Sequence, residues 1–177
     1  MLSKRRRWLK LMHSVVVVAL SSPLIIGVYE NEALIEEIKS DGKSSELLPS
    51  LFRELLQKYD IENLIYAKGP GSFMAIKVSY IFLKTLSIVK KINFLATDAF
   101  YFNDNSPIKA IGKLCFVKNK DTISTEVFKE IPYCEFSLPK KLFLKDFNID
   151  TSPQYIIGAV LRGKYKCSLM YQPPVQI

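Results

Sequence analysis

A glycine–proline–glycine turn, Gly69-Pro70-Gly71, separates a short apolar run, residues 63–67, from a long apolar segment, residues 73–90. The first run has the length of a buried strand and the second that of a helix. Glycine adopts positive φ freely and proline fixes its own φ, so this turn sets the direction in which the helix leaves the strand. Two roles fit such a turn: a phosphate cradle at the helix N-terminus, or a hinge that aims the helix at another surface.

Three strands are predicted before the turn. Residues 15–18 and 24–29 are rich in β-branched residues and are separated by a Ser-Ser-Pro turn. A second turn at Glu30-Asn31 leads to a third strand, because asparagine tolerates the positive φ that a tight hairpin requires. These segments predict an antiparallel meander.

Helices alternate with strands in the next part of the chain. Residues 45–59 carry apolar side chains at helical spacing, with Ser44 or Ser45 as the expected N-cap and Pro49 in the first turns, where proline is least harmful. The strand at 63–67, the helix at 73–90 and a strand at 91–97 complete the order β-β-β-α-β-α-β. Helices that cross over between parallel strands predict an α/β sheet.

The second half of the chain is less regular. Residues 108–128 are typical of a hairpin that turns at Asn119-Lys120-Asp121, and residues 153–165 form a last apolar segment. The polar cluster at 103–107 is the best boundary between two lobes. We therefore predict a basic N-terminal extension (1–11), a first lobe (12–102) and a second lobe (103–177).

The N-terminal segment has two interpretations. The formal net charge is +8, and a basic start followed by an apolar run is typical of a signal peptide or membrane anchor. A spanning helix needs about 20 consecutive apolar residues, whereas polar residues and a proline interrupt this run. We predict a soluble cytoplasmic protein with no membrane contact, and keep a membrane-anchored or exported protein as the alternative. The charges in question are Lys4, Arg5, Arg6, Arg7 and Lys10, and the interruptions are His13, Ser14, Ser21, Ser22 and Pro23.

The residue inventory offers little for catalysis or metal binding. His13 is the one histidine and is expected just before a strand, so neither a His-paired metal site nor a Ser-His-Asp arrangement can be assembled around it. The three cysteines are far apart and lack C-x-x-C spacing. Glu36 and Glu37 are adjacent, and solvated carboxylates explain them better than an acid/base pair. We predict no catalytic residue and no metal on this chain.

Basic residues in the second half are candidates for contact with RNA phosphates. No RNA-binding motif accompanies them, so solvated side chains are the preferred interpretation. The residues are Lys109, Lys113, Lys118, Lys120, Lys140, Lys141, Lys145, Arg162, Lys164 and Lys166.

The helix at 73–90 is apolar around most of its circumference, so we expect it to be covered on a second side in addition to the sheet. The cover is the helix at 45–59, a partner subunit, or both; Ala75 and Ser79 are four residues apart and allow another helix to approach. As a phosphate site the turn is a weak match, because neither a Gly-Lys-Ser/Thr ending nor a G-x-G-x-x-G pattern is present.

The segment from about residue 14 to residue 100 resembles the TsaB family, also called YeaZ-like proteins. These are partner subunits in the bacterial machinery that installs threonylcarbamoyl on the tRNA adenosine next to the anticodon. The family's G-P-G-S-F motif is matched residue for residue by Gly69, Pro70, Gly71, Ser72 and Phe73. Its preceding helix pattern is matched by Leu47, Leu48, Pro49, Leu55 and Leu56.

The resemblance implies an actin-like, Hsp70-like fold of the ribonuclease-H class, with a reduced second lobe. It implies a non-catalytic subunit that binds the catalytic subunit TsaD, together with TsaE. The resulting complex would bind tRNA. A homodimer is also implied as a possible assembly. ATP or ADP would lie at the interface with TsaD, with no cofactor on this chain alone. The implied partner contacts are Leu48, Phe52, Phe73, Ile76, Tyr80 and Lys84. The residues implied to form the motif turn and to contact the nucleotide at the interface are Gly69, Pro70, Gly71, Ser72, Phe73 and Lys77.

The sequence departs from the family and its fold relatives in two places. Where the family motif continues T-G-L-R, this chain has Met74-Ala75-Ile76-Lys77, which keeps a cation but not a bidentate guanidinium. Related ATPases hold magnesium with an aspartate at the end of the first strand, and this chain has Leu20-Ser21-Ser22 there. A stand-alone nucleotide-binding enzyme is therefore a less favoured alternative.

Overall fold

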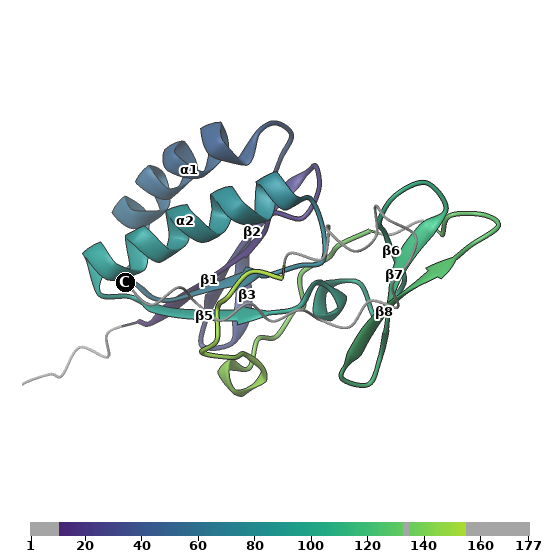
Figure 1. Ribbon diagram of the computed structural model, residues 1–177. Helices are drawn as coiled ribbons and strands as arrows, with labels where there is room; N and C mark the ends of the chain where they lie inside the picture. The colour runs from purple at the N-terminus through teal and green to yellow at the C-terminus, as the bar shows by residue number, and fades with distance from the viewer. Residues whose placement is uncertain (1–10, 133–134, 155–177) are drawn as a thin grey trace, which may run out of the picture.

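The computed structural model describes residues 11–132 and 135–154. It contains a five-stranded sheet with two helices on one face and a separate three-stranded sheet (Figure 1). The predicted α/β class and strand–helix order are confirmed. The elements are β1 (His13–Val18), β2 (Leu24–Glu30), β3 (Ala33–Ser40), α1 (Ser44–Lys58), β4 (Ile61–Ala67), α2 (Phe73–Lys90), β5 (Asn93–Thr97), β6 (Ile108–Lys109), β7 (Leu114–Asn119) and β8 (Thr122–Val127), with short 3-10 turns at Ala99–Phe102 and Leu144–Asp146.

The larger sheet has the order β3-β2-β1-β4-β5. Strands β1, β2 and β3 form the predicted antiparallel meander, and β4 and β5 run parallel to β1. The crossover helices α1 and α2 therefore lie on the same face of the sheet (Figure 1). Because the carboxyl ends of the parallel strands share one edge of the sheet, the loop after β1 and the glycine turn after β4 are neighbours.

The central strands are apolar on both faces. Val15 and Val17 pack with α1 and α2, whereas Val16 and Val18 pack into a second core cluster on the opposite face. This double burial explains why the strands read as continuous apolar runs and not as an alternating pattern.

Two local predictions near the N-terminus need correction. His13 is the first residue of β1 and not a residue before it; its side chain is buried, with Nδ1 3.3 Å from the carbonyl oxygen of Asp60 and Nε2 3.3 Å from the Glu30 carboxylate. The N-cap of α1 is Lys43, and Ser44 is the first helical residue, with no side-chain cap. A serine next to a helix start does not cap it unless its backbone is extended.

The predicted turns are confirmed. Asn31 has positive φ in the β2–β3 hairpin, and Lys120 has positive φ where β7 turns into β8. The three-stranded sheet β6-β7-β8 does not build a core of its own: Phe116 and Ile123 belong to the same cluster as Val16 and Val18. The predicted boundary between residues 102 and 103 stays a prediction.

Residues 139–154, which we call the strap, cover the face of the larger sheet that lacks helices (Figure 1, green to yellow). At the β3 edge, the Leu34 amide donates to the carbonyl of Lys140 (3.1 Å). At the β5 edge, Ala96 and Asn148 exchange two backbone hydrogen bonds of 2.9 Å. The strap thus ties one edge of the sheet to the other and pairs part of both edge strands.

Two predicted segments lie outside the described residues. These are the basic extension, apart from Leu11, and all but the first two residues of the apolar segment 153–165. Within the part of the chain that the structure describes, no helix combines the length and apolarity needed to cross a membrane.

Candidate functional site

The glycine turn is held in place by three segments of the chain. Gly69 has a φ of +117°, which disfavours any residue with a side chain. Its carbonyl accepts from the Ala99 amide at 2.7 Å, and a Cβ at this position would lie 3.0 Å from the carbonyl oxygen of Gln154. The first glycine of the motif is therefore required by backbone conformation and by the strap that packs against it.

The second glycine of the motif permits contact with the end of β1. A Cβ on Gly71 would lie 2.9 Å from the Cβ and 3.0 Å from the carbonyl oxygen of Leu20. That same carbonyl accepts from the Ser72 amide at 2.8 Å. The amide of Ser72 is thus not available to a phosphate, and this N-cap residue of α2 is fixed relative to the end of β1.

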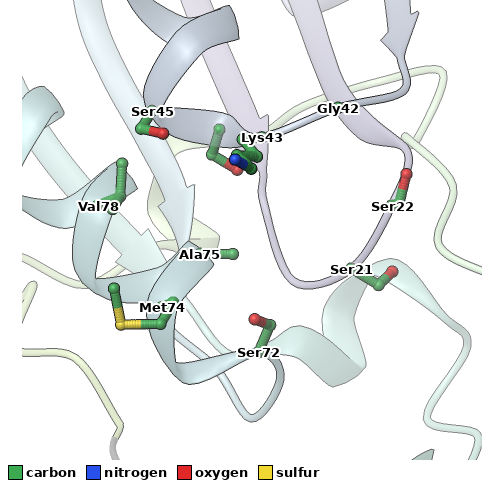
Figure 2. Close-up of a pocket in the computed structure, with 10 residues that line it drawn as sticks. Ser21, Ser22, Gly42, Lys43, Ser45, Ser72, Met74, Ala75 and Val78 are labelled. Carbon is green, nitrogen blue, oxygen red and sulfur yellow. The ribbon is translucent and has the colours of Figure 1, made fainter.

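A pocket of about 380 Å³ lies beside the turn. It sits between the N-termini of α1 and α2 and the loop that follows β1, and Figure 2 shows the serine hydroxyls and Lys43 placed around it. Neither helix has a side-chain N-cap hydrogen bond. The N-terminus of a helix favours anions, and the N-termini of α1 and α2 both adjoin this pocket. The lining residues are Ser21, Ser22, Gly42, Lys43, Ser44, Ser45, Ser72, Met74, Ala75 and Val78.

The walls of this pocket are chemically mixed. The Ser22 hydroxyl donates to the Asp41 carboxylate at 2.8 Å, and the Lys43 ammonium is 3.8 Å from the Glu46 carboxylate. Met74 and Val78 form an apolar wall. The pocket combines hydroxyls, one lysine and an apolar side, and it opens next to the first turn of α2.

Three of the six predicted partner contacts are core residues, which corrects that part of the prediction. Leu48, Phe52 and Ile76 are at most 1% exposed. Leu48 and Phe52 hold α1 against the sheet, and Ile76 faces the opposite core cluster at the start of α2. A side chain with no accessible surface does not contact another chain while this fold is intact.

The other predicted residues of α2 reach the surface to different extents. Phe73, Lys77 and Lys84 are exposed, and Tyr80 is half-buried between the rings of Tyr66 and Phe94. The Lys84 ammonium lies 5.7 Å from the centroid of the Phe94 ring, so its stem follows the β5 side of α2.

The surface that sequence reasoning missed is a row of exposed apolar residues on α2. Met74, Ile81 and Ile88 follow one another at intervals of seven, and Ile88 is 68% exposed. The expected second cover of α2 is partly provided by α1, where Phe52 and Phe82 meet edge to face at 5.4 Å. Within residues 11–132 and 135–154, no segment covers this row. We define the outer face of α2 as Met74, Lys77, Ile81, Lys84, Ile88 and Val89.

Carboxylates near the sheet edges have structural partners. Glu36 accepts hydrogen bonds from the Lys58 ammonium and from the Tyr59 hydroxyl, and these bonds lower the pKa of Glu36. Asp98, which follows β5, pairs with Lys118 and accepts from the Phe100 amide at 3.0 Å. Among the described residues, no group of three or more histidine, cysteine or acidic side chains is arranged to hold a metal.

The described body has no excess of positive charge. Residues 11–154 contain 17 basic and 17 acidic residues, so the formal net charge of +8 belongs to residues 1–10 and 155–177. Residues 103–154 contain eight basic and seven acidic residues, so the lysines of the second half do not lie in a segment of high positive net charge. Three of the ten predicted phosphate contacts, Arg162, Lys164 and Lys166, lie outside the described residues.

No protein-family model and no curated protein sequence matches this chain. Among solved structures, YeaZ from Pseudomonas aeruginosa superposes with a TM-score of 0.53 at 9% identity, covering 72% of this chain and 65% of that one. An uncharacterized protein with similarity to peptidase YEAZ, from the same organism, gives a TM-score of 0.48 at 10% identity, covering 72% and 64%. The chain thus spans just under two thirds of the length of YeaZ, and at this identity what it shares with YeaZ is the fold.

Proposed function

We propose that the protein is a TsaB-like accessory subunit. In this role it binds and organises a TsaD-type catalytic subunit, together with TsaE, for threonylcarbamoyl transfer to the tRNA adenosine next to the anticodon. The observation that carries the proposal is the position of the G-P-G-S-F motif: in a YeaZ-like fold, it begins the one helix whose outer face keeps an uncovered apolar row within the described residues.

The finer fold assignment belongs to the same proposal. An antiparallel meander followed by two parallel strands, with both crossover helices on one face, supports the actin-like, ribonuclease-H-like class. In this assignment, the described residues between 103 and 154 belong to a reduced second lobe.

The proposed subunit acts in the cytoplasm and is not catalytic. The contacts of its titratable residues support the non-catalytic role. His13 is buried between a backbone carbonyl and Glu30, and Glu36 is held by Tyr59 and Lys58. Groups engaged in this way stabilise the fold and are poorly placed to exchange protons with a substrate.

The pocket beside the turn supports the predicted nucleotide at the subunit interface. It adjoins Met74, the first residue of the outer face of α2, so a partner seated on this face would also close the pocket. In the proposal, phosphates of ATP or ADP lie against the N-terminus of α2, and the partner supplies the remaining contacts. The chain alone would then bind nucleotide weakly.

The test is to co-purify the full chain with the TsaD subunit of the same organism, and to assay threonylcarbamoyl transfer on tRNA with and without it. We expect a mixed complex on size-exclusion chromatography and transfer that requires both chains. The double variant Ile81→Ser/Ile88→Ser should weaken the complex at least about tenfold, because buried apolar anchors dominate interfaces. Ile111→Ser, at an exposed residue between β6 and β7, is the matched control, because these strands lie away from α2 (Figure 1).

Three results would contradict the proposal. Separate elution with no effect on transfer would remove the partner role. ATP hydrolysis by the purified chain would favour the stand-alone enzyme, and recovery of the chain in the membrane fraction would favour the anchored protein.

A further inference from the structure

The outer face of α2 carries two parallel rows of side chains. Met74, Ile81 and Ile88 form the apolar row; three positions further along, Lys77, Lys84 and Lys91 form a second row with the same interval of seven. In a helix, residues seven apart lie on nearly the same side, two turns from one another. The apolar row runs for about 21 Å along α2, at about 1.5 Å per residue.

The charge of this face has one sign. The helix and its C-cap contain the lysines 77, 84, 90 and 91 and no acidic residue. Elsewhere in the described body, a carboxylate lies within ion-pair distance of four lysines: Lys39, Lys43, Lys58 and Lys118. Within residues 11–132 and 135–154, the lysines of α2 have no carboxylate partner. On a body with no net charge, the exposed apolar row of α2 thus lies beside lysines that no acidic residue of the same helix offsets.

We propose that the occupant of this face is an acidic amphipathic helix of a different chain, and not a second copy of this one. The inference rests on the proposed function, and adds to it the chemistry of the partner. A helix with apolar residues at intervals of seven matches the apolar row, and glutamates or aspartates beside them match the lysine row. Two copies packed α2 against α2 would bring lysine rows together, with no acid on either helix to compensate.

The two rows have different effects on binding. The apolar row supplies most of the affinity, because it is the part that becomes buried. The lysines lie at the rim, where charges select the partner and speed association, and where salt screens them. Charge reversal should therefore change partner preference and salt dependence, whereas truncation of the apolar row should abolish binding to any helix.

The experiment uses two synthetic helical peptides with leucine at intervals of seven, one flanked by glutamates and one by lysines. Binding of each to the full chain is measured by fluorescence anisotropy at low and high salt. We expect the acidic peptide to bind at least about tenfold more tightly than the basic one at low salt, with the preference shrinking at high salt. In the variant Lys77→Glu/Lys84→Glu the preference should reverse.

Matched controls separate this effect from a general loss of fold or charge. Lys113→Glu/Lys120→Glu reverses two exposed lysines away from α2 and should keep the preference for the acidic peptide. Ile81→Ser/Ile88→Ser should lose both peptides while its circular dichroism and unfolding midpoint stay near those of the unaltered chain. Equal binding of the two peptides, or unchanged preference after Lys77→Glu/Lys84→Glu, would overturn the inference.

Sedimentation of the chain alone tests whether a second copy of the chain binds to the outer face of α2. We expect a monomer, and we expect a mixture of the unaltered chain with the Lys77→Glu/Lys84→Glu variant to associate more strongly than either alone. A dimer of the unaltered chain that Ile81→Ser/Ile88→Ser dissociates would overturn the inference, because the second copy would then be the occupant. The peptide and sedimentation experiments do not use TsaD. If no complex with TsaD forms, the proposed function is contradicted. The peptide experiment still decides whether the outer face of α2 prefers an acidic helix.

Discussion

The two faces of the five-stranded sheet are covered in different ways. On one face, α1 and α2 come from chain segments next to the strands they cover, and their apolar side chains recur with helical periodicity. On the other face, the cover is the 3-10 turn after β5, the three-stranded sheet and the strap, which come from later parts of the chain. Of these, only the hairpin of β7 and β8 has a local sequence signature. Local periodicity thus builds the first face, whereas long-range backbone hydrogen bonds hold the strap on the second.

The largest effect is expected on the helix-covered face. Phe52→Ala removes a buried ring that packs on Phe82, and should lower the free energy of unfolding by about 3–5 kcal/mol. Urea unfolding measures this change, and Ile88→Ser, at an exposed position of α2, should stay within about 0.5 kcal/mol. A folded Phe52→Ala of normal stability that fails to bind the partner would restore Phe52 as a contact residue.

The junction between the two faces should be the next most sensitive place. Gly71→Val puts a branched side chain against the backbone and side chain of Leu20, and should cost about 1–3 kcal/mol. It should also tilt the start of α2 and weaken partner binding. Ser72→Ala, one residue further on, changes an exposed side chain that caps nothing and serves as the control. Unchanged affinity in folded Gly71→Val would contradict the role of the turn in aiming α2.

On the strap-covered face, a single backbone hydrogen bond can be removed by substitution. Asn148→Pro deletes the amide that donates to the Ala96 carbonyl, at an expected cost of about 0.5–1.5 kcal/mol. Hydrogen exchange at the Ala96 amide should accelerate, because the strap loosens there first. Asn148→Ala keeps the backbone donor and should leave that exchange rate unchanged. If both variants exchange alike, the strap is held by side chains and not by edge pairing.

The smallest effect is expected at the surface of the helix-covered face, where Glu36 meets Tyr59 and Lys58. These hydrogen bonds lower the pKa of Glu36 from 4.5, so their stabilisation is present above that pH and is lost as the pH falls through the lowered value. The unfolding midpoint of Glu36→Gln should therefore be slightly lower than that of the unaltered chain at neutral pH, and the difference should vanish in acid. A difference that persists in acid would point to packing instead of charge.

The same comparison explains what the sequence could predict. The meander, both helices, the strand between them and the hairpin at Lys120 all have local signatures, and the structure confirms them. The strap has none: the amide of Asn148 is committed to a strand some 50 residues earlier, which no window of sequence reveals.

The candidate site, like the fold, was predictable from the sequence only in part. The position of the turn before α2 was predictable from its glycines, but Leu48, Phe52 and Ile76, which were predicted as partner contacts, are core residues. Core and interface draw on the same apolar residues, so composition does not separate them. The spacing of Met74, Ile81 and Ile88 was a usable signal, because an apolar row beside lysines differs from one that continues the core stripe.

The strap also has a consequence for the order of synthesis. When the ribosome has made β5, the five strands and both helices are complete, but the edge strands β3 and β5 still lack the partners that residues 140 and 148 later bring. At about 5–20 residues per second, the chain waits on the order of 3–10 s between Thr97 and Asn148 with both edges open. During that interval the nascent sheet is exposed to pairing with other chains, and a chaperone that shields strand edges would act on this protein before the strap emerges.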